Sequence, residues 1–420
     1  MPPAATQSRA IDLRVRVRAN RLLPRDFVFA RMRTMKSTDL GPLLRARPSA
    51  PVYVIGAGIT GCVLAERITS LFDRPVIVLE KRPVVGGNSY ADIDPKTGIE
   101  VHRYGSHIFH TTDKKVWDYI RRFTDFNVYW HKVLLRSGGR VYSMPINLKT
   151  VNDYYGTQMS PDEARAFLAE EIRKEGIDKP CNLEEKAVSL VGRGLYDRMI
   201  RGYTAKQWGR DPKELPESII NRLPVRFRYQ DDYFDTPMQG IPAKGFGALF
   251  AALLANSRIE VRTGVDFFAV RDSLPKDAIV VYTGMIDRLF DHCFGALEWR
   301  SLRFEWETVG VRDFQGTSVM NYGDPDVPFT RIHEFKHYHP EWREAYECER
   351  SVICREYPQT WEPGLEAYYP VNDDRNQRLF ARYLTEAKKL PNLLVAGRLG
   401  CYRYWDMDGA IAAALEVFKE

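Results

Sequence analysis

A glycine-rich turn near residue 56 constrains the fold of this chain more than any other feature. The four residues at 52–55, VYVI, predict a buried strand, and glycines follow at positions 56, 58 and 61. Residues 60–71 have a helical pattern, and residues 75–82 predict a second strand. A strand, a glycine-rich turn, a helix and another strand form a β-α-β unit of the kind that holds dinucleotides.

The spacing of these glycines predicts contact with a pyrophosphate. Gly56, Gly58 and Gly61 permit a tight turn and let the backbone approach the phosphates, while the helix start around Thr60 offers N–H groups and a positive dipole end. Glu80 ends the second strand, where a carboxylate accepts hydrogen bonds from both ribose hydroxyls and repels a 2′-phosphate. The unit therefore favours FAD or NAD over NADP.

Composition limits the other interpretations. The first 50 residues hold 11 Lys and Arg against three Asp, a net of +8, so residues 51–420 hold 50 basic and 52 acidic residues. The folded body therefore lacks the basic excess typical of nucleic-acid binding. No apolar run approaches the roughly 18–20 residues of a membrane span. We expect residues 1–50 to be a basic tail, disordered or upstream of the true start, and the body to begin near Pro51.

Cysteine and histidine usage gives no metal site. The six cysteines are scattered without a CxxC pair, which favours reduced thiols in the cytoplasm and disfavours zinc. The segment His333–His339 contains three histidines, which we interpret as polar residues of a strand or loop. We predict no metal.

Residues 80–88, EKRPVVGGN, decide between the two cofactors. An acid at a strand end followed by a glycine pair resembles the FAD-binding families related to amine oxidases, and it places Lys81, Gly87 and Asn88 at the cofactor. The turn GRLG at 397–400 lies between a predicted strand and a predicted helix. Such flavoproteins return to the cofactor site at their C-terminus, so we predict FAD.

The whole chain predicts an α/β fold: a Rossmann-like FAD-binding domain with an inserted helical domain and a mixed or antiparallel β-sheet domain. Capping patterns at Ser160 and Asn182 start helices, residues 223–240 predict strands, and residues 259–270 predict a strand pair. The predicted boundaries are 51–130, 241–275 and 375–420 for the FAD-binding domain, 149–222 for the helical domain, and 131–148, 223–240 and 276–374 for the β-sheet substrate domain.

Seven further motifs occur in order along the body and resemble the bacterial UDP-galactopyranose mutase family. The likeness covers nearly all of residues 51–420 and not the first 50. The motifs are GIEVHRYGSHIFHT (98–111), GYTAKQWG (202–209), INRLPVRF (220–227), DFQGTSVMNY (313–322), PFTRIHEFKHYHP (328–340), EAYYP (366–370) and GRLGCYRYWDMDGAI (397–411).

The resemblance implies an isomerase that interconverts UDP-galactopyranose and UDP-galactofuranose without net oxidation. In this family reduced FAD acts as a covalent catalyst: flavin N5 bonds to the anomeric carbon, the sugar ring opens and recloses, and UDP returns. It also implies a cytoplasmic homodimer, a flavin reductant that the sequence does not identify, and a product that supplies galactofuranose to cell-surface glycans.

The resemblance also implies the residues that bind substrate. Arg222 and Arg331 correspond to two arginines that clamp the diphosphate, and we expect both to be catalytic. Tyr369 and Tyr404 correspond to phosphate-contacting tyrosines, and residues 209–222 to a mobile loop that carries Arg222. The residues implied near the uridine, the ribose and the sugar are Tyr203, Thr204, Trp208, Tyr233 and Asn321.

Further residues are implied at the flavin. His107 corresponds to a histidine beside the flavin, with a role in positioning and in the response to redox state, whereas His110 is expected to be structural. Arg398, Asp406 and Met407 correspond to the region that closes over the pyrophosphate and the isoalloxazine, and Asp406 is also implied at the substrate.

Two other classes of protein stay open. An FAD-dependent oxidase or desaturase of the amine-oxidase type shares the fold, but takes a hydride donor and does not need Arg222 and Arg331 together. A flavin-bearing binding protein or redox sensor needs only the cofactor motifs and His107. Two positions depart from the family pattern, Trp405 at an expected leucine and Cys401 at an expected small hydroxylic residue, and we assign neither a catalytic role.

Overall fold

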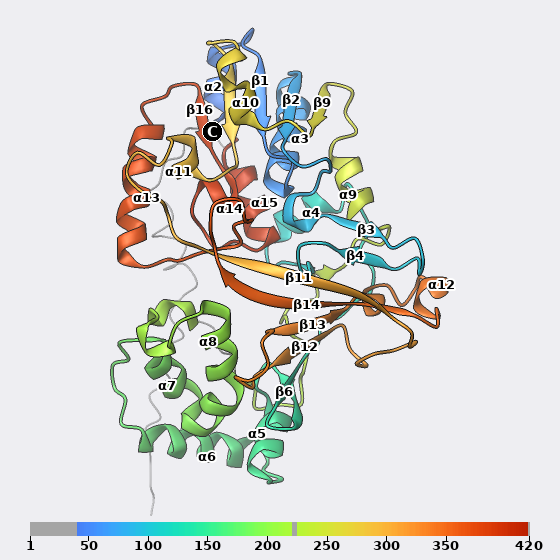
Figure 1. The fold of residues 1–420 in the computed structure, drawn as a ribbon, viewed down its shortest axis with the longest axis vertical. Coiled ribbons are helices and arrows are strands. Elements are labelled where there is room, and N and C mark those ends of the chain that lie inside the picture. Colours follow the sequence, from blue (N-terminus) through green and yellow to red (C-terminus); the bar gives the residue numbers. More distant parts are fainter. Residues whose placement is uncertain (1–39, 221–224, 419–420) are drawn as a thin grey trace, which may run out of the picture. The chain divides into compact units, whose positions relative to one another are not determined.

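A five-stranded parallel sheet carries the glycine-rich turn. The computed structural model of the protein describes residues 40–220 and 225–418. Its strands follow the order β16-β10-β1-β2-β9, and all neighbours run parallel (Figure 1). This arrangement confirms the predicted Rossmann-like unit and the return of the C-terminal strand to the same sheet. The bounds are β1 Val52–Ile55, β2 Val76–Glu80, β9 Ile259–Thr263, β10 Ile279–Tyr282 and β16 Leu393–Val395.

Both faces of this sheet are buried, because successive residues of β1 enter different apolar cores. Val52 and Val54 lie in one core, and Tyr53 and Ile55 lie in another. Parallel sheets need such cover on both faces. The helices that contribute to the first core are α3 (Ile59–Phe72), α4 (Lys114–Ile120), α9 (Gly245–Leu253) and α15 (Met407–Glu416), and those of the second are α10 (Phe267–Val270), α11 (Ile286–Leu289), α13 (Asp374–Ala387) and α14 (Gly397–Gly400).

Two predictions near this sheet are wrong. Residues 259–270 form β9 and the helix α10, because the Asp266 carboxylate caps a helix by accepting from the Phe268 N–H at 3.0 Å. Strand β10 pairs with β1 in the parallel sheet, although the predicted boundary at residue 276 assigned it to the substrate sheet. An apolar strand such as IVVY reads the same in either sheet, so only its pairing decides where it belongs.

The end of the predicted basic tail is a buried helix, which corrects the prediction of a disordered tail there. Helix α2 (Leu40–Ala46) places Leu40 and Leu44 in the first apolar core. Arg74 donates to the Leu44 carbonyl oxygen at 3.2 Å and fixes the segment to the loop before β2. The remainder of the predicted tail, residues 1–39, lies outside the described residues.

A seven-stranded sheet follows the order β15-β11-β14-β13-β12-β6-β7. Only the β12–β6 pair is parallel, so the prediction of a mixed sheet is confirmed. Figure 1 shows its long β11–β14 pair crossing between the parallel sheet and helices α7 and α8. The bounds are β6 Val133–Ser137, β7 Arg140–Met144, β11 Trp299–Val309, β12 Val319–Tyr322, β13 Arg331–Glu334, β14 Ser351–Thr360 and β15 Tyr369–Pro370.

The predicted helical segment is helical and has its own apolar core. Ser160 and Glu163 form a reciprocal capping box, and the Asn182 side chain accepts from the Glu185 N–H at 2.9 Å. Inward residues such as Val188 and Leu195 are fully buried. The elements are α5 (Leu148–Tyr155), α6 (Pro161–Lys174), α7 (Leu183–Leu195), a π-helix (Tyr196–Arg201), α8 (Gly202–Trp208) and 3₁₀ turns at Pro212–Glu214 and Glu217–Ile220.

The described residues 225–240 do not form the strands predicted for residues 223–240. In the described part, 225–240, the chain contributes only β8 (Gln239–Gly240) and single bridges to two other segments. Asp231, Asp232 and Pro237 oppose a continuous ladder there. The remaining elements are β3 (Ala91–Ile93), β4 (Glu100–His102), β5 (Phe109–His110), α12 (Arg343–Tyr346) and 3₁₀ turns at Gly87–Ser89, Arg271–Ser273 and Phe335–Tyr338.

None of the helices in residues 40–220 and 225–418 combines the length and the apolar character that crossing a bilayer requires.

Candidate active site

One large cavity gathers the predicted site residues. Its volume is about 1230 Å³, and it is lined from the parallel sheet, the seven-stranded sheet and α8. Every predicted site residue in the described part of the chain lines it. Arg222 lies outside the described residues. We call the part around Gly56, Gly58, Thr60, Gly61, Glu80, Lys81, Gly87 and Asn88 the nucleotide end, and the part around Tyr203, Thr204, Trp208, Tyr233, Asn321, Arg331, Tyr369 and Tyr404 the substrate end.

The nucleotide end is a backbone cradle that only glycine permits. A Cβ at Gly61 would lie 1.9 Å from the Gly56 carbonyl oxygen, and a Cβ at Gly87 would lie 2.8 Å from the Cα of Gly58. Gly56 has a φ of +99°, a left-handed conformation that other residues rarely adopt. Helix α3 begins beside them with no side-chain cap on its first N–H groups. These bare amides and the close backbone suit a pyrophosphate.

Glu80 lies at the end of β2, where the predicted ribose contact requires it. Its buried carboxylate accepts from the Ala57 N–H at 2.7 Å and from the Arg82 N–H at 2.9 Å. Each oxygen retains a second lone pair, so the group still accepts hydroxyl hydrogens from a ribose. The Arg82 guanidinium stacks 4.0 Å over the Tyr104 ring, and its Nη1 is buried without a protein hydrogen-bond partner in the described chain. A polar ligand would supply that partner.

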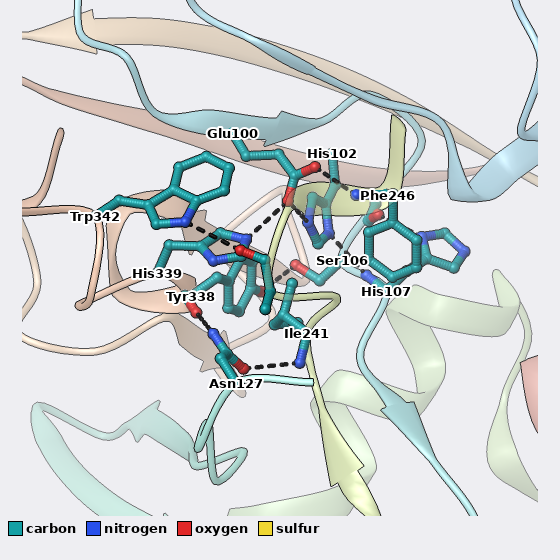
Figure 2. Close-up of polar contacts among 12 residues, drawn as sticks. Glu100, His102, Ser106, His107, Asn127, Ile241, Phe246, Tyr338, His339 and Trp342 are labelled. Atoms are coloured by element: carbon teal, nitrogen blue, oxygen red, sulfur yellow. Dashed lines mark hydrogen bonds and ion pairs between the residues drawn. The ribbon is translucent and has the colours of Figure 1, made fainter. Parts of the chain in front are cut away.

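The loop that carries His107 is fixed from behind by a buried polar cluster (Figure 2). The His107 N–H donates to His102 Nδ1 at 3.1 Å, and the Tyr338 hydroxyl donates to the Ser106 hydroxyl oxygen. His102 stacks on Tyr338 with ring centroids 5.0 Å apart. Behind them, the Glu100 carboxylate accepts from the Phe246 N–H at 2.7 Å. Glu100 therefore anchors the cluster that supports the loop.

His107 is a neutral imidazole at physiological pH. Its Nδ1 lies 2.7 Å from the Gly105 carbonyl oxygen, and burial together with the nearby His102 lowers its pKa to about 3. A neutral ring whose Nδ1–H is committed to a carbonyl oxygen presents an unprotonated Nε2. Such a histidine is suited to orienting a neighbouring group rather than to donating a proton.

The substrate end centres on the Arg331 guanidinium. Its Nη2 donates to the Tyr203 hydroxyl oxygen, and its Nε lies 3.3 Å from Glu356 Oε1. Burial disfavours the charge, but Glu356 holds the pKa of Arg331 well above its usual value. Burial also opposes ionisation of the Glu356 carboxyl, yet Arg331 and His333 keep its pKa below the usual value. The pair thus stays ionised, and Arg331 offers its remaining donors to an anion.

Aromatic hydroxyls surround this arginine. The rings of Tyr369 and Tyr404 have centroids 5.3 Å apart, and Tyr404 is 54% exposed because it faces the cavity. Burial raises the pKa of Tyr203 to about 12 and that of Tyr369 well above the usual value. All of these hydroxyls therefore stay protonated and can donate to an anion.

Arg398 and Asp406 line the cavity between its nucleotide end and its substrate end. Arg398 Nε donates to the Trp405 carbonyl oxygen at 2.9 Å, and its guanidinium lies 5.4 Å from the Tyr404 ring centre. Asp406 occupies the N-cap position of α15, but its side chain makes no capping hydrogen bond. It is 56% exposed, and its carboxylate lies 3.8 Å from His110 Nε2. Met407 begins the helix, so the first amides of α15 face the cavity.

The sequence reasoning missed several residues at the site. Glu356 lies in β14 directly opposite Arg331 of β13, a pairing that depends on strand register. His110 lines the cavity and stacks on Phe234 at 3.6 Å, although a purely structural role was expected. Gln207, which was also missed, has a buried carbonyl oxygen without a protein partner in the described chain, as does the predicted Asn321. For Gln207 the signal was available, because it lies four positions after Tyr203 on one helix face.

A group of possible metal ligands lies away from this cavity. Single ligand atoms of Asp313, Glu334 and His337 lie within 4.8 Å of one another. The Glu334 oxygens already accept from the N–H groups of Phe314 and Gln315, each at 2.9 Å. These bonds give the carboxylate a structural role in the turn before β12.

Comparisons with known proteins agree with this geometry. The fold and the cavity define a protein with a Rossmann-like dinucleotide-binding domain, and a Rossmann-like NAD(P)-binding family model matches residues 54–123. The family model described as UDP-galactopyranose mutase matches residues 198–404. A probable UDP-galactopyranose mutase of Klebsiella pneumoniae is 39% identical over 373 residues, which is 88% of this chain and 94% of the relative. The chain therefore belongs to the UDP-galactopyranose mutase family.

Two further relatives bear on the reaction. A dTDP-fucopyranose mutase of Escherichia coli is 39% identical over 369 residues, 87% of this chain and 96% of that protein. A UDP-galactopyranose mutase of Mycoplasma pneumoniae is 32% identical over 379 residues, 86% of this chain and 94% of the relative.

Solved structures support the fold. A crystal structure of reduced UDP-galactopyranose mutase superposes with a TM-score of 0.68 at 17% identity and covers 88% of this chain and 95% of its own. A putrescine oxidase variant superposes with a TM-score of 0.51 at 10% identity, which shows a shared fold and no more.

Proposed function

We propose that this protein is a UDP-galactopyranose mutase that binds FAD and acts with the cofactor reduced. It interconverts UDP-galactopyranose and UDP-galactofuranose with no net redox change. When bound, reduced FAD would supply the nucleophile that displaces UDP at the anomeric carbon, and the returning UDP would displace the flavin after ring contraction. The observation that carries the proposal is the cavity itself: a dinucleotide cradle at one end and a half-buried, ionised arginine among tyrosine hydroxyls at the other.

The nucleotide end would hold FAD. Gly56, Gly58, Gly61 and the start of α3 would receive the pyrophosphate, and Glu80 the ribose hydroxyls. Thr60, Lys81, Gly87 and Asn88 line the same end. Arg398, Asp406 and Met407 would close over the pyrophosphate and the isoalloxazine. The first amides of α15 would stabilise negative charge on the reduced ring system.

The substrate end would hold the UDP-sugar. Arg331, with Arg222 from outside the described residues, would neutralise the diphosphate as UDP departs and returns, and Tyr369 and Tyr404 would donate hydroxyl hydrogens to it. Glu356 keeps Arg331 charged and aligned. The uridine and sugar would contact Tyr203, Thr204, Trp208, Tyr233 and Asn321, all of which line the cavity.

His107 would orient the flavin and not transfer protons. Its pKa of about 3 keeps the ring neutral at physiological pH. The exposed carboxylate of Asp406 lines the same cavity, and its role would be to contact substrate. Residues 209–222 would move to bring Arg222 onto the diphosphate.

An anaerobic assay tests the proposal. The purified yellow protein is reduced with dithionite, given UDP-galactofuranose, and the nucleotide sugars are separated by chromatography. We expect UDP-galactopyranose to form only with the reduced flavin. Absence of conversion with FAD bound and fully reduced would contradict the proposal and favour an oxidoreductase that takes a hydride donor.

A second candidate substrate follows from the comparisons. The Escherichia coli relative, named a dTDP-fucopyranose mutase, is as similar to this chain as the Klebsiella relative. The same assay with dTDP-fucofuranose in parallel measures both specificity constants. A higher kcat/KM for the dTDP-sugar would keep the reaction type and change the substrate.

The cellular setting belongs to the proposal as well. We expect a cytoplasmic homodimer that receives electrons from a separate reductant and supplies galactofuranose for cell-surface glycans. Chromatography with light scattering measures the oligomeric state directly.

A further inference from the structure

Helix α8 presents two different faces. Tyr203, Thr204, Gln207 and Trp208 line the cavity, and their spacing places them on one side of the helix. Gly202 and Lys206, four positions apart, lie on another side and contact the loop 323–330 between β12 and β13. One short helix therefore joins the substrate end to a loop that lies outside the cavity.

The Lys206 ammonium is surrounded by backbone carbonyl oxygens. It donates to the carbonyl oxygens of Tyr322 at 2.8 Å, Asp324 at 2.9 Å, Val327 at 3.0 Å and Phe329 at 3.1 Å. The three N–H donors are shared among four acceptors, which extend from the end of β12 through the loop. Burial lowers the pKa of Lys206 to about 8, while Asp324 and Asp326 oppose the shift, so the group is charged at pH 7.

Close backbone packing beside Lys206 reinforces the same junction. A Cβ at Gly202 would lie 2.0 Å from the Gly323 carbonyl oxygen, so only glycine fits there. On its far side, the loop is tied to the β6–β7 turn, because the Asp324 carboxylate accepts from the Gly138 N–H at 2.8 Å. The loop is therefore held between α8 and that turn.

This loop connects two strands that carry substrate-end residues. Asn321 lies near the end of β12 and Arg331 at the start of β13, and the two are register partners. Arg331 also donates to the hydroxyl oxygen of Tyr203, which is on α8. A displacement of the loop relative to α8 would separate Arg331 from Tyr203 and change the width of the substrate end.

We propose that Lys206 is a positioning residue that locks α8 to the β12–β13 loop, so that Tyr203 and Arg331 are held at the separation a nucleoside diphosphate requires. The inference rests on the proposed function of this cavity. Lys206 itself does not line the cavity.

The chain offers a matched control in Lys336. Its side chain is also buried, and its Nζ donates to the carbonyl oxygens of Arg312 and Cys348. Lys336 does not line the cavity. The variants Lys206→Met and Lys336→Met both leave carbonyl oxygens without their donor, so we expect both to lower thermal stability. Only the first disturbs the substrate end.

The test compares UDP affinity of the oxidised holoenzymes by calorimetry at pH 7, together with KM and kcat for UDP-galactofuranose after reduction. We expect Lys206→Met to weaken UDP binding and raise KM by about tenfold or more, with FAD content and the flavin spectrum unchanged. We expect Lys336→Met to leave both within about twofold of wild type. Equal effects of the two variants, or no effect of Lys206→Met, would overturn the inference.

A second pair of variants covers a failure of Lys206→Met to fold. Gly202→Ala pushes the same loop away, whereas Gly247→Ala places a methyl in open space on α9. We expect UDP binding to be weaker in Gly202→Ala and unchanged in Gly247→Ala. Unchanged UDP binding in Gly202→Ala would also overturn the inference. If wild type binds UDP but does not isomerise the sugar, the proposed function fails while this comparison still decides the role of Lys206. Absence of UDP binding to wild type overturns both.

Discussion

The two ends of the cavity are built in opposite ways. The nucleotide end is made of backbone from one continuous stretch, residues 52–88, in which glycines allow the chain to approach itself. The substrate end is made of side chains from α8, β12, β13, β14, β15 and the segments that precede β8 and α15, which are distant in sequence. The difference teaches that cofactor binding here is a property of a local fold unit. Substrate binding depends on how several elements are held together.

The largest effect on activity is expected when a side chain is removed from the substrate end alone. In Arg331→Ala, the diphosphate loses a charge-assisted donor and Glu356 loses its partner. We expect turnover to fall by about 100- to 1000-fold, while FAD stays bound. Arg222→Ala is expected to behave alike. Anaerobic assays measure turnover, and the flavin absorbance measures the bound FAD. Full activity in Arg331→Ala would contradict the assignment of Arg331 as a residue that binds the diphosphate.

The converse change attacks the nucleotide end alone. In Gly61→Ala the new methyl collides with the Gly56 carbonyl oxygen, so the turn must open. We expect the FAD dissociation constant to rise at least about tenfold, and Glu80→Ala to weaken FAD retention through loss of the ribose contact. Gly247→Ala is the control, because nothing lies within 4 Å of its added methyl. Normal FAD affinity in Gly61→Ala would show that the cradle is not the cofactor site.

A smaller effect is expected behind the His107 loop, where the two ends meet. The neighbouring His102 and His339 hold the pKa of Glu100 at about 2 in spite of burial, and Glu100 raises the pKa of His339. The ionised Glu100 carboxylate stabilises the fold at pH values above its usual pKa of 4.5. It loses this effect as the pH falls toward its lowered pKa of about 2. The protonated His339 stabilises the fold at pH values below its usual pKa of 6.5. It loses this effect as the pH rises through its raised pKa.

The variant Glu100→Gln should therefore cost most between pH 4.5 and 6.5, by about 2 kcal/mol of unfolding free energy. Urea unfolding of wild type and variant across pH gives the difference. Glu260→Gln, which removes an exposed ion pair with Arg262, is the control and should change little. A pH-independent difference would mean that the charge of Glu100 does not matter.

The smallest effect is expected at Cys401, which departs from the family pattern. Burial raises the pKa of this thiol to about 12, so it is neutral and unreactive at physiological pH. We expect Cys401→Ser to keep turnover within about twofold and iodoacetamide to label the exposed Cys181 and Cys293 first. Mass spectrometry of the labelled protein checks the order. Fast labelling of Cys401 with loss of activity would contradict this interpretation.

Sequence reasoning succeeded where structure is local. The glycine turn, the Ser160 capping box and the Asn182 cap of α7 follow from neighbours within a few residues, and each was predicted. Sequence reasoning failed where the structure depends on which strands pair and in which register. The strand β10 could join either sheet, and Glu356 faces Arg331 only because of the β13–β14 register. Helix α2 was missed because the charge of its surroundings concealed three buried leucines.

A crystal structure of the reduced protein with FAD and UDP would test the contrast between the two ends most directly. We predict that the FAD pyrophosphate lies at the start of α3 and that the UDP diphosphate contacts Arg331, Tyr369 and Tyr404. A UDP diphosphate bound at the start of α3, or one that makes no contact with Arg331, would contradict the account.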